Sequence, residues 1–178
     1  MKRAPHTVFT ALLRGVAGAL PRAPGAARAL SAAARPPPPL LSAFPWRATL
    51  DTRWEDMDCY NHINNVKFYS FFDTAVNRML LELGLLALPP SPTSLAGFVV
   101  ASSCSFLAPL RFPLPVTVGV RVGRLGTSSV SYEVGVFTAD GACAATGSFT
   151  HAYVNPATHR AQPLPGAMRE ALQRLCAA

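Results

Sequence analysis

Residues 64–84, NNVKFYSFFDTAVNRMLLELG, carry the clearest helical pattern in the sequence. Their apolar side chains recur at three- and four-residue spacing, at Tyr69, Phe72, Val76, Met79, Leu80 and Leu83. Because an α-helix turns once every 3.6 residues, this spacing places the apolar side chains on one face. Asn64 is a residue type that caps helix starts, and Gly84 is one that ends helices. The segment therefore predicts one long amphipathic helix with a buried face.

A two-residue period replaces the helical one further along the chain. Valines alternate with small or polar residues at 116–123 and again at 130–137, which predicts strands with one buried face. Asp140-Gly141 is a tight hairpin signal. The expected strands cover residues 46–53, 98–107, 116–123, 130–137 and 142–154, and the strand at 98–107 is apolar on both faces. A short helix is expected at 166–176.

The order of these elements is strand, long helix and then four strands joined by turns. A meander of this kind can wrap one helix and bury its apolar stripe, so we predict an α+β fold. At 178 residues the chain is long enough for one domain with a core and too short for two ordinary domains.

The basic side chains are concentrated at the start of the chain. Residues 1–50 hold seven basic side chains and no acidic one, whereas the remainder holds nine of each. A neutral domain has no electrostatic footprint for a nucleic acid, so we expect no nucleic-acid partner. A polyproline stretch at 36–39 follows the basic segment. We predict a leader and linker over residues 1–43 and one folded domain over 44–178.

The leader is rich in Arg, Ala and Pro, lacks acids, and could form a short amphipathic helix over residues 8–20. These features are typical of a mitochondrial transit peptide, which predicts delivery to the matrix. The alternative is a secretory signal whose apolar stretch at 7–13 is interrupted by Arg14. No apolar run approaches the roughly 20 residues that span a bilayer, so we expect no transmembrane segment.

Other common types of functional site lack support in the sequence. The four cysteines lie far apart, without a C-x-x-C pair or zinc-like His spacing, so we expect neither disulfides nor a metal. The sequence contains no phosphate-binding loop, no dinucleotide fingerprint and no G-x-S-x-G motif. We expect no cofactor.

Residues 54–65, WEDMDCYNHINN, gather three carboxylates, a histidine and three amides just ahead of the long helix. The first N–H groups of a helix have no partner within it, and the helix dipole favours negative charge there. A carboxylate beside such a helix start suits acyl transfer. The carboxylate activates water or attacks, while the N–H groups stabilise an oxyanion.

The pattern Arg53-Trp54-x-Asp56-x-Asp58-x-x-x-His62-x-Asn64-Asn65-x-x-Phe68 resembles the signature of hotdog-fold thioesterases of the 4-hydroxybenzoyl-CoA thioesterase type. Residues 58–67 are also similar to the matching stretch of plant acyl-ACP thioesterases. With residues 106–112 and 124–130, which fit later strands of the family, the resemblance covers about 46–176. It implies a curved antiparallel sheet of about five strands wrapped around one long helix.

The resemblance also implies roles for residues of this segment. Asp58 matches the catalytic acid, either as general base on water or as nucleophile through an anhydride. His62 matches a polar position that orients the carboxylate or the thioester, and the helix start at Asn64, Asn65 and Val66 would bind the oxyanion. The implied partners are an acyl-CoA substrate and a second copy of the chain, in a homodimer or homotetramer.

Three arginines are further candidates for substrate binding, because Arg111, Arg121 and Arg124 could contact CoA phosphates.

The sequence departs at two places from many members of the thioesterase family that it resembles. They have Gly at the position of Asn61, and they have Gly-Asp in the region of residues 113–115.

Several alternatives stay open at this point. Asp58 could merely cap the helix or shape a turn, and Asp56, Asp58 and His62 could bind a metal. His151, on a strand between Phe149 and Tyr153, is expected to lie in the core or an interface.

For the whole chain we predict hydrolysis of acyl-CoA thioesters, with fatty acyl groups favoured. The alternatives are an enoyl-thioester hydratase or dehydratase and a non-catalytic acyl-binding protein.

Overall fold

The computed structural model describes residues 37–89 and 94–176. Its helices are η1 (Leu41–Ala43), η2 (Trp54–Asp56), α1 (Asn65–Glu82) and α2 (Gly166–Gln173), and its strands are β1 (Trp46–Leu50), β2 (Ala96–Phe106), β3 (Val116–Leu125), β4 (Ser129–Phe137) and β5 (Cys143–Val154). Residues 1–36 of the predicted leader and linker (1–43) lie outside the described residues, so the division into leader and domain stays a prediction.

Helix α1 begins and ends where its sequence signals predict. The Val66 N–H donates to Asn64 Oδ1 at 3.0 Å, which caps the start. Gly84 follows the last turn with a φ of +67°, a conformation that glycine adopts without strain. The buried face comprises Phe68, Phe71, Phe72, Ala75, Val76, Met79 and Leu80. This face is rotated from the predicted stripe, because Tyr69 is only half-buried and Leu83 is exposed.

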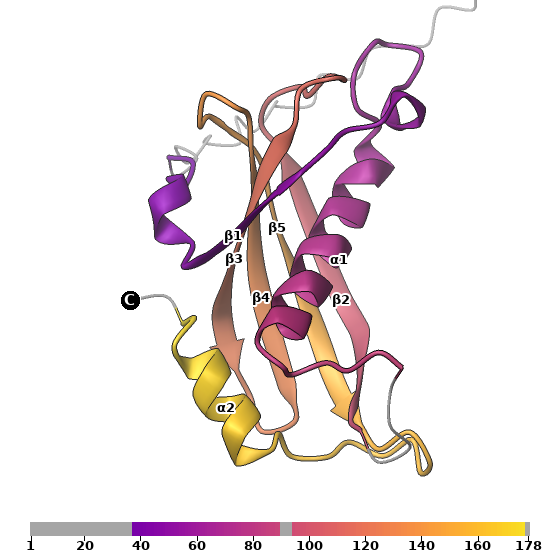
Figure 1. The fold of residues 1–178 in the computed structure, drawn as a ribbon, viewed down its shortest axis with the longest axis vertical. Helices are drawn as coiled ribbons and strands as arrows, with labels where there is room; N and C mark the ends of the chain where they lie inside the picture. The colour runs from indigo at the N-terminus through magenta and orange to yellow at the C-terminus, as the bar shows by residue number, and fades with distance from the viewer. Residues whose placement is uncertain (1–36, 90–93, 177–178) are drawn as a thin grey trace, which may run out of the picture. The chain divides into compact units, whose positions relative to one another are not determined.

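The five strands form one antiparallel sheet in the order β1-β3-β4-β5-β2. The sheet curls around α1 (Figure 1), as the α+β prediction required. The alternating valines of β3 and the Val130, Tyr132, Val134 and Val136 side chains of β4 are buried in the core beneath α1. The apolar stripe of the helix and the period-two pattern of the strands therefore meet in one core.

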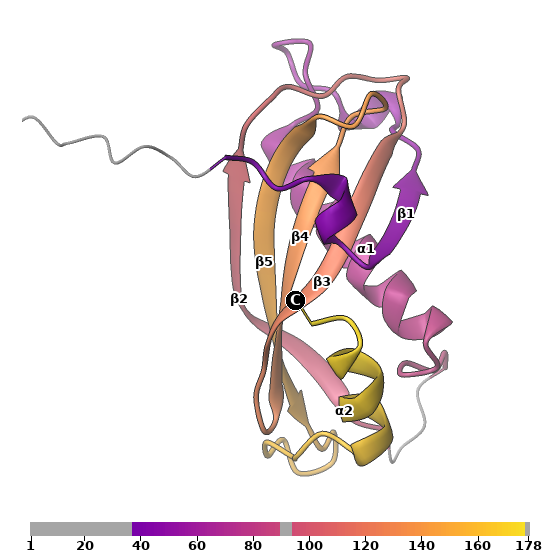
Figure 2. The same ribbon diagram turned by 90° about the vertical axis from the view of Figure 1, so that its left-hand side faces the viewer.

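Strand β2 differs from the simple meander that the sequence suggested. It pairs with β5 and forms one edge of the sheet, while β1 forms the other edge by pairing with β3 (Figure 2). The segment 107–115 therefore crosses between strands that are not neighbours. Because an edge strand has only one neighbour, the apolar side chains Phe98, Val99 and Val100 of β2 are exposed rather than buried.

The outer face of the sheet, opposite α1, is covered in part by the segment before β1. The Phe44 ring is 2% exposed and lies against Gly119 and Gly135. These two glycines are cross-strand partners, and a Cβ at either would come within 2.8 Å of Phe44 atoms. The paired glycines therefore form the socket for Phe44, with Phe137 at its edge.

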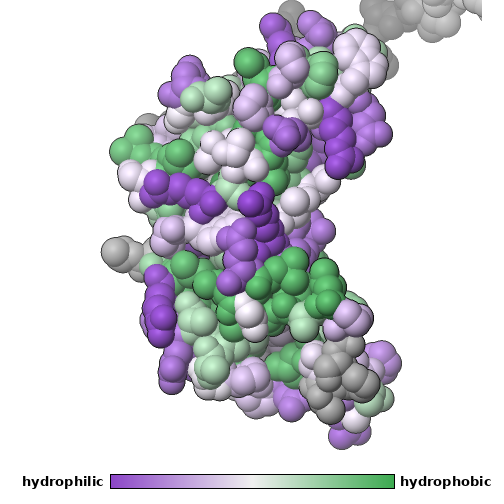
Figure 3. All heavy atoms as spheres, in the orientation of Figure 1, coloured by the Kyte–Doolittle hydropathy of each residue, from purple (hydrophilic) through white to green (hydrophobic). Residues whose placement is uncertain are grey.

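Exposed hydrophobic side chains also gather at the C-terminal end of α1 (Figure 3). They include Leu81, Leu83 and Leu88. Across residues 37–89 and 94–176, none of the helices combines the length and apolarity needed to cross a membrane.

Candidate active site

The loop between η2 and α1 is closed by backbone hydrogen bonds. The Asp58 N–H donates to the His62 carbonyl at 2.8 Å, and the Ile63 N–H donates to the Leu110 carbonyl at 2.8 Å. Asn61 adopts a φ of +61°, the left-handed conformation that glycine favours and that Asn tolerates better than most residues. The loop therefore makes its turn with Asn at the position where many relatives have Gly.

The Asp58 carboxylate is fixed through one of its oxygens. Asp58 Oδ1 accepts the Tyr60 N–H at 2.8 Å and the His62 N–H at 3.3 Å. Among the described residues, no donor reaches Asp58 Oδ2. One oxygen thus fixes the direction of the carboxylate, and the other is free to accept a proton or a hydrogen bond.

Asp58 borders a hollow of about 390 Å³ at the start of α1. The hollow is lined by Asp58, His62, Ile63, Asn65, Phe68, Phe106, Leu107, Ala108 and Pro109. The Phe68 and Phe106 rings pack edge to face at 5.1 Å and make its apolar wall. Polar groups on one side and apolar walls on the other suit a ligand with a reactive polar centre and an apolar chain.

At the start of α1, one of the two backbone N–H groups that we expected to bind an oxyanion is free of a hydrogen bond within the described residues, and the other is occupied. The Val66 N–H, which we expected to help bind an oxyanion, is occupied by the Asn64 side chain at 3.0 Å. Asn64 therefore acts as the cap and does not contact the ligand through this oxygen. The Asn65 N–H has no hydrogen-bond partner in the described part of the chain, and Asn65 lines the hollow. Of the N–H groups that we expected to bind an oxyanion, that of Asn65 is therefore the one left open to a ligand in the described structure.

His62 and Arg111 lie together, although 49 positions separate them in the sequence. An Nη2 of Arg111 lies 3.2 Å from His62 Nε2. Arg111 was predicted only as a contact for CoA phosphates. The fold instead brings its guanidinium to the ring of a predicted site residue, because the 107–115 segment docks on the site loop through Leu110 and Phe112.

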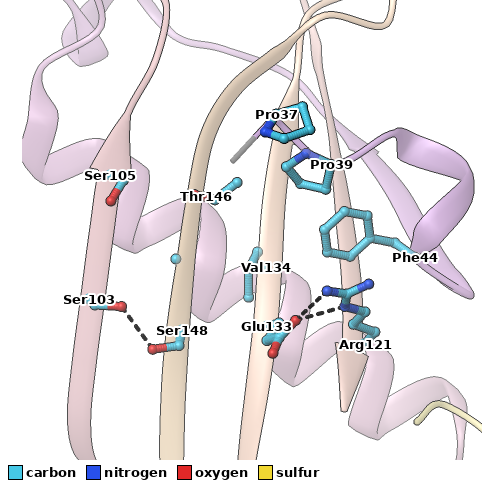
Figure 4. Close-up of a pocket in the computed structure, with 11 residues that line it drawn as sticks. Pro37, Pro39, Phe44, Ser103, Ser105, Arg121, Glu133, Val134, Thr146 and Ser148 are labelled. Carbon is cyan, nitrogen blue, oxygen red and sulfur yellow. Dashed lines mark hydrogen bonds and ion pairs between the residues drawn. The ribbon is translucent and has the colours of Figure 1, made fainter. Parts of the chain in front are cut away.

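The other two candidate arginines lie elsewhere. Arg121 forms an ion pair with Glu133 at 2.6 Å on the outer face of the sheet, with Phe44 beside its guanidinium (Figure 4). Arg124 is exposed near the end of β3. At the usual rise per residue it lies about 25 Å along the strand from Val116, the first residue of β3. Within one chain, the structure therefore joins Arg111 to the site but not Arg121 or Arg124.

The remaining carboxylates of the segment support the fold. Asp56 is buried, accepts the Arg53 N–H at 2.7 Å, and pairs with Lys67 at 3.2 Å. Over the described ranges, no group of three or more His, Cys, Asp or Glu side chains is placed to hold a metal ion. The alternative in which Asp56, Asp58 and His62 bind a metal together therefore has no structural support.

His151 is a polar residue whose setting the sequence only partly predicted. It is 3% exposed on the inner face of β5, with its ring 5.2 Å from the Tyr132 ring. Neither ring nitrogen has a hydrogen-bond partner among the described residues. Burial lowers the pKa of this imidazole, and the charge of Asp73 partly opposes the shift. A neutral imidazole is therefore favoured in the folded protein.

Comparison with protein families identifies the chain. Residues 52–172 match the Thioesterase-like superfamily. The chain belongs to this family. The match spans the site loop, α1 and the whole of β2 to β5. The predictions of a hotdog fold and of a thioester hydrolase are thus confirmed at the level of the superfamily. The comparison with curated proteins finds no match.

Solved structures of the superfamily's fold are similar over most of the chain. The PA5185 protein of Pseudomonas aeruginosa is 41% identical over 80% of this chain and 99% of its own, with a TM-score of 0.75. A Thermus thermophilus thioesterase solved with coenzyme A and Zn is 31% identical over 75% of this chain and 95% of its own, with a TM-score of 0.61. A 1,4-dihydroxy-2-naphthoyl-CoA thioesterase from Synechocystis, at 17% identity over 73% and 96% and a TM-score of 0.67, supports the fold alone.

Proposed function

We propose that this protein hydrolyses acyl-CoA thioesters to a free acid and CoA, with Asp58 as the general base. One observation carries the proposal. Asp58, whose carboxylate has one oxygen unpaired among the described residues, and Asn65, whose N–H has no partner there, line the same hollow. The membership of the Thioesterase-like superfamily supports the reaction class. A T. thermophilus relative was solved with coenzyme A, which supports a CoA ester as substrate.

Each group has a separate task in this reaction. Asp58 Oδ2 takes a proton from water, whose oxygen attacks the thioester carbon. The carbonyl oxygen becomes an oxyanion, and the Asn65 N–H stabilises it with the positive end of the α1 dipole. The oxyanion then collapses back to a carbonyl as the C–S bond breaks, and the CoA thiolate takes the proton that Asp58 removed from water, which restores the carboxylate and releases the free acid and CoA.

The proposal favours a fatty acyl group over an aromatic one. Ile63, Phe68, Phe106 and Leu107 line the hollow, and none of these four side chains offers a hydrogen bond to a ring hydroxyl. The direct experiment is a thiol-release screen of the full chain across saturated acyl-CoA lengths, with 4-hydroxybenzoyl-CoA as the aromatic arm and an enoyl-CoA as the hydration arm. We expect thiol release with medium or long chains. Binding without thiol release, or hydration of the enoyl-CoA alone, would refute the proposal.

The mechanism itself can be separated from its nucleophilic alternative. A single turnover in ¹⁸O-labelled water, followed by mass spectrometry of the peptide containing Asp58, tests for an anhydride that water attacks at the Asp58 carbon. Such hydrolysis introduces the label into the carboxylate, whereas a general base leaves it unlabelled.

The proposed assembly is a homodimer or homotetramer built along β2. This edge strand is 11 residues long and exposes apolar side chains, and such an edge is open to pairing with another strand. Sedimentation of the wild type and of Val100→Lys tests the assembly. A wild-type dimer that becomes a monomer in the variant is the expected result.

The proposed location is the mitochondrial matrix. The acid-free basic segment at residues 1–50 supports it. Fusion of residues 1–43 to a fluorescent protein tests it, and export of the fusion from the cell would favour the secretory alternative.

A further inference from the structure

The contact between Arg111 and His62 constrains where the imidazole carries its proton. A guanidinium has only donors and keeps its charge in proteins, so His62 Nε2 must accept at 3.2 Å. A neutral imidazole has one donor and one acceptor nitrogen, and therefore the proton sits on Nδ1. A doubly protonated ring would set an N–H against an N–H and lose the contact.

The backbone at Arg111 is held in place by the residues on either side of it. The Leu110 carbonyl accepts the Ile63 N–H at 2.8 Å, and the Phe112 N–H reaches the Met57 sulfur at 3.4 Å. Leu110 itself is buried. These contacts attach the 107–115 segment to both ends of the site loop, so Arg111 approaches His62 from a fixed backbone.

The position of the proton on the His62 ring matters because the site has few hydrogen-bond donors for an oxyanion. The helix start supplies the Asn65 N–H, while the Val66 N–H is already bonded to Asn64. His62 lines the same hollow as Asp58 and Asn65, and its backbone N–H is directed to Asp58. With Nε2 turned to Arg111, the ring Nδ1–H is a donor that His62 can offer at this hollow, in addition to the backbone N–H and the side-chain amide of Asn65.

We infer that Arg111 is a positioning residue, which fixes His62 as the Nδ1–H tautomer so that this N–H donates to the thioester carbonyl oxygen beside the Asn65 N–H. The inference rests on the proposed thioesterase reaction and assigns His62 a donor role in it, with Asp58 left as the base. It also replaces the phosphate-contact role for Arg111 with one that acts through His62.

The tautomer is measurable without turnover. Ring ¹⁵N chemical shifts of the full chain at neutral or higher pH, with His62→Gln to identify the signals, report which nitrogen is protonated. We expect a protonated Nδ1 and an unprotonated Nε2 in the wild type. In Arg111→Met the signals should shift toward the Nε2–H form. A wild-type ring protonated at Nε2 would overturn the inference.

Kinetics separate positioning from phosphate binding. Arg111→Met should lower kcat by about tenfold, which is less than the roughly 10²–10³-fold loss expected when an oxyanion donor is removed outright, because His62 itself remains. The loss should be equal for an acyl-CoA and the matching acyl-pantetheine. Arg111→Lys should recover part of kcat because it retains a donor. Arg174→Met is the matched control, because Arg174 is exposed and directly follows α2, which lies at the opposite end of the fold from the start of α1 (Figure 1).

The alternative results are distinct. A higher KM for acyl-CoA with unchanged kcat, and no effect on acyl-pantetheine, would mean that Arg111 binds phosphate and would overturn the inference. Full turnover by Asp58→Asn would instead refute the proposed function and leave the tautomer measurement standing.

Discussion

Two hollows of nearly equal volume lie on opposite faces of the sheet, about 390 Å³ at Asp58 and about 400 Å³ on the outer face. In the outer one the charged side chains pair with each other. Arg121 pairs with Glu133, and the Ser103 hydroxyl bonds to the Ser148 hydroxyl at 2.8 Å (Figure 4). At Asp58, one carboxylate oxygen and one helix-start N–H have no partner among the described residues. An unpaired carboxylate oxygen, and not volume, therefore distinguishes the hollow that is suited to chemistry.

The most direct test of this difference replaces one carboxylate in each hollow by the corresponding amide. Asp58→Asn should lower kcat by about 10³-fold, since general base catalysis contributes on the order of 10²–10⁴. Glu133→Gln, which weakens only the Arg121 ion pair, should leave kcat unchanged. Thiol release measured at saturating acyl-CoA checks both. Equal losses in the two variants would contradict the distinction between the hollows.

A second prediction concerns stability on the outer face. Phe44→Ala empties the socket formed by Gly119 and Gly135 and should lower the free energy of unfolding by about 3 kcal/mol or more. The kcat of the remaining folded protein should not change, because Phe44 lies on the face opposite α1. Urea unfolding and thiol release on the same samples test this. A loss of activity without a loss of stability would place the outer hollow in the reaction.

A third prediction uses His151, which belongs to neither hollow. Its pKa is lowered by burial, so below about pH 6.5 the unfolded chain binds more protons at this residue than the folded one. The free energy of unfolding should therefore fall as the pH decreases from about 6.5 toward the folded-state pKa, by at most about 1.4 kcal/mol per pH unit from this group.

His151→Phe is the variant that isolates the effect. Urea unfolding at pH 7.5, 6 and 5 should show a shallower loss of stability in the variant than in the wild type. Parallel curves would mean that His151 does not titrate differently in the two states.

The sequence predicted those features that depend on local signals. Helix α1 starts after Asn64 and stops before Gly84 because Asn caps a helix start, and glycine favours the left-handed conformation of a helix end, through local backbone interactions. The alternation of β3 and β4 predicted their buried faces for the same reason. The loop with Asp58, His62 and Asn65 also follows directly from residues that are close in the chain.

Features that depend on distant pairings were missed or misplaced. The edge position of β2 depends on its pairing with β5 rather than with β3, and nothing in its own residues specifies that neighbour. The Arg111–His62 contact depends on the docking of the 107–115 segment. The occupied Val66 N–H could have been predicted, because a capping Asn accepts from the second or third helical residue.

A crystal structure with a non-hydrolysable acyl-CoA analogue would place the thioester carbonyl relative to Asp58 and Asn65. The carbonyl oxygen of the analogue should lie within hydrogen-bond distance of the Asn65 nitrogen, at about 3.2 Å or less, with Asp58 Oδ2 on the side from which water attacks. An analogue seated beside Arg121 and Glu133 on the outer face, with Asp58 remote from its carbonyl, would contradict the account.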